Sequence, residues 1–126
     1  MDIKEKLQSA EKKLQELVEY KQSNFSPNID QIIKPKVQEI LQLIPSDFSV
    51  PGWTASLKAK SFYLRGATID CLSEYSKEAD ESLSKAVKLD PSLIDAWNCL
   101  GNCFCKKNDL KSALNCYETA QKMVNC

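Results

Sequence analysis

The residues of this 126-residue chain with the most chemical potential are its six cysteines. Cysteine thiolates act as nucleophiles, metal ligands and redox sensors. The chain has no histidine, so neither a Ser/His/Asp nor a Cys/His catalytic arrangement can form within it. Its three glycines lie far apart and make no phosphate-binding loop. We therefore expect a protein that is not an enzyme.

The spacing of the cysteines does not favour a metal site. Zinc sites usually pair short Cys-x-x-Cys segments, and none is present. Cys99 and Cys103 lie one helical turn apart and share a face, whereas Cys105 points elsewhere. We expect neither a metal nor another cofactor, with Cys103 and Cys116 acting as small hydrophobic packing residues. Redox sensing by Cys105 or Cys126 is the lesser alternative.

Charge and composition limit the classes to which the protein can belong. Seventeen basic and seventeen acidic side chains give a net charge of zero, so no attraction to nucleic acid or anionic membrane is expected. Residues 1–13 are charged throughout and lack the apolar core of a signal peptide. We expect reduced thiols and a location in the cytosol or the nucleus, with no membrane segment.

The strongest pattern in the sequence repeats every 34 residues. Ala79 and Ala113 have this spacing, as do Leu83 and Tyr117, and Ala86 and Ala120. Trp97, Leu100, Gly101 and Phe104 precede the second set in the order typical of a tetratricopeptide repeat. Each such repeat is a pair of antiparallel helices, and stacking of neighbouring pairs completes the core.

The upstream repeat has one irregularity. Gly66 and Gly101 are 35 residues apart, and so are Phe62 and Trp97. The simplest interpretation is one extra residue in the first repeat's turn, near residues 73–76. Small residues, here the two glycines and the repeated alanines, let helix backbones approach closely.

We predict an all-α fold of about six helices, paired as three antiparallel hairpins in a right-handed tetratricopeptide-type superhelix. Residues 1–50 form an N-terminal hairpin, read either as a cap or as a diverged repeat. Residues 53–92 form repeat 1 and residues 93–126 form repeat 2. The expected helices are 3–20, a second one containing Pro35, 53–71, 78–89, 93–106 and 110–124.

Pro35 permits two positions for the start of the second helix. A helix that begins near Lys34 would place the proline in its first turn, where the missing N–H costs nothing. Alternatively, the helix begins after Ser26-Pro27 and is kinked at Pro35. We favour the start near Lys34.

A concave groove for a peptide is the site that this fold predicts. The first helix of each repeat would line it at spacings of three and four residues, and Asn98 and Asn102 could bind a peptide backbone through their amides. The plainer alternative is that these are solvated polar residues. The candidate groove residues are Lys60, Tyr63, Ala67, Asp70, Asp95, Asn98, Asn102 and Cys105.

A groove that clamps the C-terminal carboxylate of a chaperone is disfavoured. Such clamps use lysine, arginine and paired asparagines across three repeats. Tyr63 and Ala67 stand where a second asparagine pair would be, and Asp70 and Asp95 should repel a carboxylate. A chaperone-tail-binding co-chaperone is therefore a minor alternative.

Three segments carry a more specific resemblance: residues 13–18, residues 83–89 and residues 96–101. They resemble the N-terminal region of the tetratricopeptide repeat protein five family, also called Strap, a stress-responsive cofactor. The resemblance implies further repeats and an oligonucleotide-binding-fold domain beyond this chain. It also implies protein partners, either transcription cofactors or nascent tubulin at the ribosome, whose recognition triggers tubulin mRNA decay.

Repeat arrays usually end in a helix with a polar outer face. Because no such helix follows residue 124, we expect this chain to be part of a longer array. The alternative is a self-associating structural adaptor whose exposed C-terminal edge, including Leu110, Leu114 or Tyr117, pairs with another molecule.

Overall fold

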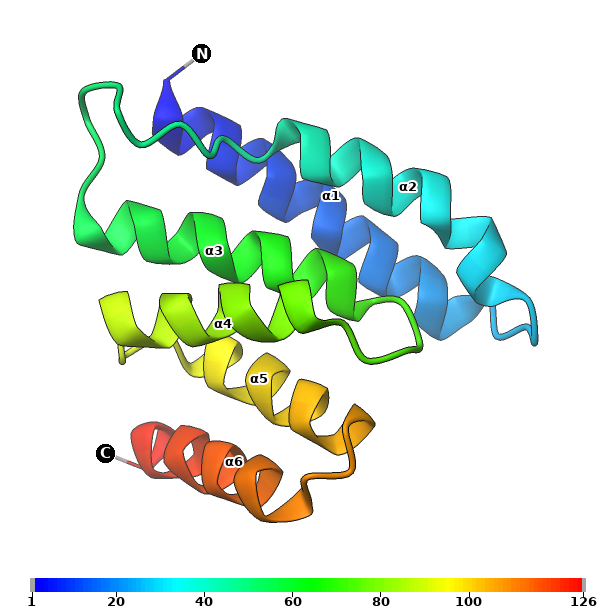
Figure 1. Cartoon of the computed structure of the whole chain (residues 1–126). Coiled ribbons are helices and arrows are strands. Elements are labelled where there is room, and N and C mark those ends of the chain that lie inside the picture. Colours follow the sequence, from blue (N-terminus) through cyan, green and yellow to red (C-terminus); the bar gives the residue numbers. More distant parts are fainter. Residues whose placement is uncertain (1, 126) are drawn as a thin grey trace.

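The computed structural model describes residues 2–125, and six α-helices form three antiparallel hairpins within them (Figure 1). This confirms the predicted all-α class. The predicted boundaries lie within three residues of those observed, except for α2. The helices are α1 (Ile3–Ser23), α2 (Ile29–Leu43), α3 (Ala55–Asp70), α4 (Lys77–Leu89), α5 (Ile94–Lys106) and α6 (Leu110–Val124).

Short polar side chains fix where four of these helices begin. Asp2, Thr54, Ser76 and Asp109 each accept a hydrogen bond from the backbone N–H three residues later. Such N-caps satisfy donors that have no partner inside the helix, which is why Ser, Thr and Asp are preferred there.

The start of α2 corrects the favoured interpretation of Pro35. The helix begins at Ile29, directly after the Ser26-Pro27 connection, and Pro35 lies inside it. The proline leaves the carbonyl of Gln31 without its intrahelical donor, but Gln31 is exposed and water can serve it. Burial of Ile33 and Val37 on the opposite face holds the helix across the proline.

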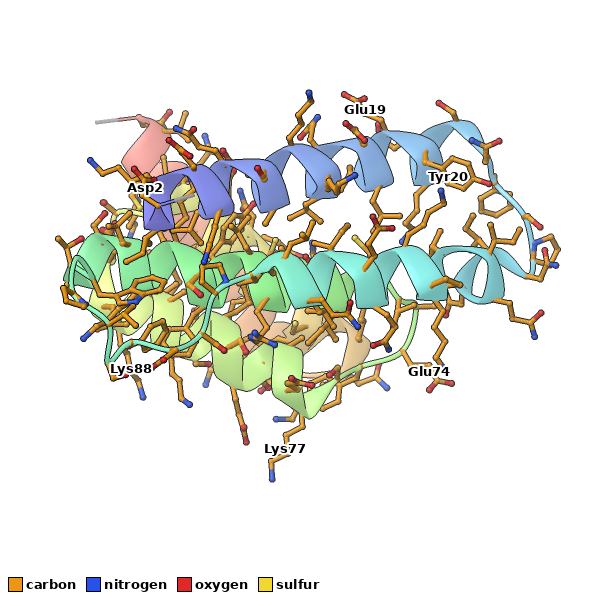
Figure 2. All side chains as sticks on the ribbon, turned by 90° about the horizontal axis from the view of Figure 1, so that it is seen from above. Asp2, Glu19, Tyr20, Glu74, Lys77 and Lys88 are labelled. Carbon is orange, nitrogen blue, oxygen red and sulfur yellow. The ribbon has the colours of Figure 1, made fainter. Side chains whose placement is uncertain are left out.

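Helix α3 is the centre of the stack, because it contacts α1, α2, α4 and α5. The first helices of the three hairpins, α1, α3 and α5, lie side by side and run in the same direction in Figure 1. The view from above shows charged side chains such as Glu19, Lys77 and Lys88 pointing away from the stack (Figure 2).

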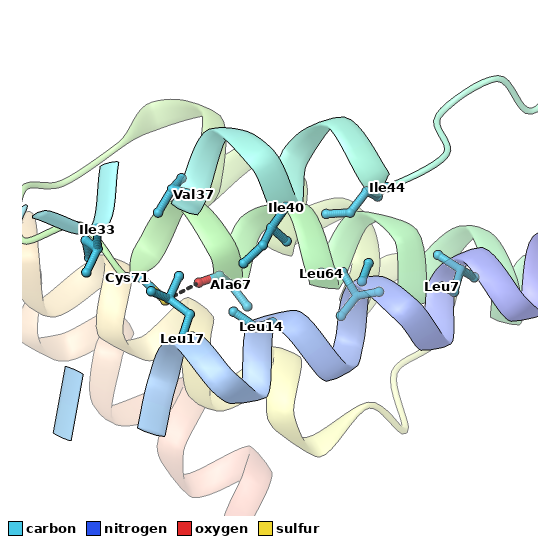
Figure 3. Close-up of a cluster of buried hydrophobic side chains, with 11 residues drawn as sticks. Leu7, Leu14, Leu17, Ile33, Val37, Ile40, Ile44, Leu64, Ala67 and Cys71 are labelled. Carbon is cyan, nitrogen blue, oxygen red and sulfur yellow. Dashed lines mark hydrogen bonds between the residues drawn. The ribbon is translucent and has the colours of Figure 1, made fainter. Parts of the chain in front are cut away.

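Two apolar clusters hold the helices together. One joins α1, α2 and α3, with Leu7, Ile33 and Leu64 almost completely buried (Figure 3). The other joins α3 to α4, α5 and α6 around Leu83 and Leu100. Because α3 contributes to both, the N-terminal hairpin and the two repeats share a continuous core.

Both helical glycines lie where a side chain would collide with the partner helix. A Cβ at Gly66 would stand 2.5 Å from Leu83 Cγ, and one at Gly101 would stand 2.7 Å from Tyr117 Cε1. The repeated alanines Ala79, Ala86, Ala113 and Ala120 are all buried, as is Leu100, whereas Trp97 and Phe104 are half-buried. Trp97 also donates its indole N–H to the carbonyl of Pro91, at 2.8 Å.

The two repeats differ in the connection between their helices. Residues 71–76 join α3 to α4, whereas residues 107–109 join α5 to α6. The difference exceeds the one residue that the spacing indicates, because α3 ends earlier and α4 begins later relative to the repeated positions. Asn108, with φ of 65°, makes the tighter turn after α5.

Candidate peptide-binding groove

A groove of about 700 Å³ runs along the side of the stack formed by α1, α3 and α5. Its walls come mainly from the first helix of each hairpin, with one residue of α6 at the edge. It is lined by Glu11, Leu14, Gln15, Val18, Lys21 and Gln22 of α1; Tyr63, Ala67 and Asp70 of α3 with Cys71 after it; Asp95, Cys99, Asn102, Cys105 and Lys106 of α5; and Tyr117 of α6.

Six of the eight residues predicted for the groove line it. They are Tyr63, Ala67, Asp70, Asp95, Asn102 and Cys105. The other two, Lys60 and Asn98, are not part of its lining. Lys60 instead places its Nζ 3.3 Å from a carboxylate oxygen of Glu11, and Asn98 is exposed. A binding role for the six stays a prediction.

We did not predict the contribution of α1 from the sequence, because we expected only the first helices of the two repeats to line the groove. The apolar spacing of residues 3–18 identifies the buried face of α1, and the groove residues lie beside that face. Treating residues 1–50 as a diverged repeat would have included α1 in the groove wall. Lys21 and Lys106 were missed as well, since no local pattern marks them.

Asn102 has less free hydrogen-bonding capacity than its sequence position suggests. The hydroxyl of Tyr117 donates to Asn102 Oδ1, and Cys105 Sγ lies 3.6 Å from the same hydroxyl. Burial, followed by the contact with Cys105, raises the pKa of Tyr117 to about 12, so its proton stays in place at neutral pH. The amide NH₂ of Asn102 is the group that remains for a ligand.

Asp70 does not present an uncompensated negative charge to the groove, which corrects one argument made from the sequence. Lys106 Nζ lies 2.8 Å from Asp70 Oδ1 and 2.7 Å from each of the carbonyl oxygens of Asp70 and Leu72. Lys21 of α1 donates to the carbonyl of Cys71. The two lysines thus satisfy carbonyls at the end of α3 that have no helical partner.

Cys71 and Cys99, which line the groove, are protonated thiols at neutral pH. Burial is the main cause that raises the pKa of Cys99 to about 12, and it also raises the pKa of Cys71. Neutral thiols are poor nucleophiles and serve here as small apolar surface. Within residues 2–125, no group of three or more Cys, Asp or Glu side chains is placed to hold a metal ion.

The stacked hairpins and the lateral groove define a helical-repeat protein of the tetratricopeptide type, a class whose concave surfaces bind other proteins. No family model matches the chain. In the part that the structure describes, no helix has both the length and the apolar character needed to span a bilayer.

The chain is a homologue of tetratricopeptide repeat protein 5. It is 32% identical to the Bos taurus protein over 127 aligned residues, which cover 94% of this chain. It is 43% identical to the Mus musculus protein over 67 residues and 44% identical to the Homo sapiens protein over 63 residues, about half of the chain in each case. The bovine match spans 28% of that relative's length, and the other two span 15% and 14%.

Proposed function

We propose that this chain is a non-catalytic protein-interaction scaffold that binds a short peptide segment in the groove between α1, α3 and α5. The observation that supports this most is the composition of the groove. Leu14, Val18, Tyr63 and Ala67 supply apolar surface, and charged residues flank it at both ends. A concave, largely apolar site with a few polar groups is the usual form of a ligand site.

The relatives of this chain suggest which partners to test. The resemblance to tetratricopeptide repeat protein 5 implies work in the cytosol or the nucleus, with either nascent tubulin chains or stress-responsive transcription cofactors. Because the chain spans about a quarter of the bovine relative, it would supply one part of the recognition surface.

Fluorescence anisotropy with labelled peptides from the tubulin N-termini tests the tubulin alternative directly, since the N-terminus leaves the ribosome first. Gln15→Trp fills the groove from an exposed position on α1 and should weaken binding. Gln8→Trp is the matched control, because Gln8 is exposed on the same helix but does not line the groove. Binding that is equal in both variants would place the peptide elsewhere.

Self-association through α6 is a second candidate, favoured by one observation. Leu110, Leu114 and Val124 are 68%, 57% and 62% exposed on this helix. Exposed apolar residues on one helix are typical of an interaction surface. Sedimentation velocity should then show a dimer whose fraction rises with concentration and falls in Leu114→Glu. A monomer at every concentration would remove this candidate. Tyr117 is unsuitable for the test, because it packs against Gly101 inside the hairpin.

A further inference from the structure

The groove has an acidic end. Glu11 of α1 and Asp95 of α5 both act on Tyr63 of α3, where, after burial and Cys99, they help to raise the pKa of the phenol. Glu11 is offset by Lys60 at 3.3 Å. Asp95 is exposed and has no ion pair within 4 Å among the described residues. Asp95 is therefore the acidic charge that remains for a ligand.

The opposite end is basic. Lys106 uses its three ammonium donors on Asp70 Oδ1 and on the carbonyls of Asp70 and Leu72. Lys21 donates one hydrogen bond, to the carbonyl of Cys71, and has no ion pair within 4 Å among residues 2–125. Lys21 thus keeps a positive charge and two donors beside the groove.

Asp30 is close enough for the charge of Lys21 to act on it, but its carboxylate already accepts hydrogen bonds outside the groove. Its oxygens accept from the backbone N–H and the hydroxyl of Ser73, at 3.0 Å and 2.8 Å. Burial raises the pKa of Asp30, but the two hydrogen bonds from Ser73, together with the nearby charges of Lys21 and Lys106, lower it below its usual value. Asp30 does not line the groove, so a ligand carboxylate would find Lys21 available.

The distance between the two ends follows from helix geometry. The three groove helices run in the same direction (Figure 1), and Lys21 lies ten residues beyond Glu11 while Lys106 lies eleven beyond Asp95. At about 1.5 Å per helical residue, the two ends are ~15 Å apart along the helix axes. Because α3 lies between α1 and α5, and packed helices are about 8–10 Å apart, Lys21 and Asp95 are separated by roughly 20–25 Å. An extended peptide advances about 3.3 Å per residue, so it would cover this distance in roughly six to eight residues.

We propose that the groove selects an extended peptide segment that carries an Asp or Glu side chain at Lys21 and a Lys or Arg side chain at Asp95, roughly six to eight residues apart with apolar residues between them. The inference rests on the proposed function and names the class of peptide that the same groove binds. Opposite charges placed at both ends fix the register of the peptide, while the apolar surface between them contributes most of the affinity.

Display of random internal segments, flanked by neutral linkers so that no peptide terminus takes part, tests this selection. We expect the enriched segments to carry one basic and one acidic side chain at the stated spacing. Binding of an enriched segment should weaken about three- to fivefold in Lys21→Gln and in Asp95→Asn, as for a partly exposed ion pair, and should weaken further as salt is raised. Lys12→Gln and Glu118→Gln, at exposed positions outside the groove, should bind like the unmodified chain.

A double-mutant cycle keeps the result independent of folding. Replacing the peptide's acidic residue by Gln should cost affinity with the unmodified chain but nothing further with Lys21→Gln. Segments that bind in the groove, as judged by loss of binding in Gln15→Trp, but ignore Lys21→Gln and Asp95→Asn would overturn the charge selection and leave the proposed function standing. Failure to enrich any segment sensitive to Gln15→Trp would overturn both.

Discussion

Lys106 holds the end of α3 through Asp70, with its Nζ 2.8 Å from the carboxylate Oδ1 and 2.7 Å from the backbone carbonyl of the same residue. Only 22% of the lysine side chain and 11% of the aspartate side chain are exposed. The contact links α5 to the central helix at the point where the chain leaves α3 for α4. It therefore stabilises the stack and shapes one end of the groove.

Loss of this contact should destabilise the fold. Lys106→Met would remove the ammonium donor from the Asp70 carboxylate and from two backbone carbonyls, and we expect the free energy of unfolding in urea to fall by about 2 kcal/mol. Lys111→Met, at an exposed position on α6, should change it by less than about 0.5 kcal/mol. Equal effects of the two changes would mean that the ammonium group of Lys106 makes no specific contribution to the stability of the fold.

The two helical glycines should differ in their tolerance of a methyl group. At Gly66 the new Cβ would meet the fully buried Leu83 at 2.5 Å and the backbone oxygen of Ala79 at 3.1 Å. At Gly101 it would meet the ring of the half-buried Tyr117, which has room to shift toward solvent. We expect Gly66→Ala to lower the free energy of unfolding by about 1–3 kcal/mol and Gly101→Ala to lower it by less. Both substitutions gain the same helix propensity, so the difference between them reports the packing clash. Urea denaturation measures both, and the reverse order would contradict the packing described.

Alkaline pH should weaken the fold partly through Cys99. Burial raises its pKa from 9.0 to about 12, so the unfolded chain loses this proton at lower pH than the folded chain does. The resulting stability is present below about pH 9 and is lost as the pH rises from there toward 12. The free energy of unfolding, measured across this pH range, should decline less steeply in Cys99→Ala than in the unmodified chain. Cys105→Ala, at an exposed thiol, is the control, and parallel curves for Cys99→Ala and the unmodified chain would rule the effect out.

The two asparagines should differ in peptide binding. Asn102 lines the groove and keeps its amide donors, so Asn102→Ala should weaken binding of a groove peptide about fivefold, as expected for one hydrogen bond. Asn98 is outside the lining, and Asn98→Ala should leave the affinity unchanged. Fluorescence anisotropy with one peptide and both variants measures this. A larger loss in Asn98→Ala would shift the binding surface toward the start of α5.

Local chemistry made much of the fold predictable from the sequence. The small residues Ala79 and Ala86 recur 34 positions later as Ala113 and Ala120, as close packing of the helices in each repeat requires. The pairing of α3 with α4 and of α5 with α6 could therefore be inferred without coordinates. The start of α2 could not be inferred in the same way. Whether a helix continues through Pro35 depends on the burial of Ile33 and Val37 against other helices, which outweighs the local preference for a proline in the first turn.

Apolar periodicity and small-residue spacing depend only on positions along one chain, so they predict an all-helical repeat fold with a groove on the first helices of its two repeats. The electrostatics of that groove, in contrast, depend on how the helices pack against one another. The pairings of Asp70 with Lys106, of Glu11 with Lys60 and of Cys71 with Lys21 join residues 36, 49 and 50 positions apart. Long flexible lysine side chains carry no local signal for the partner that they will reach, so the charges left for a ligand appear only when the helices are packed.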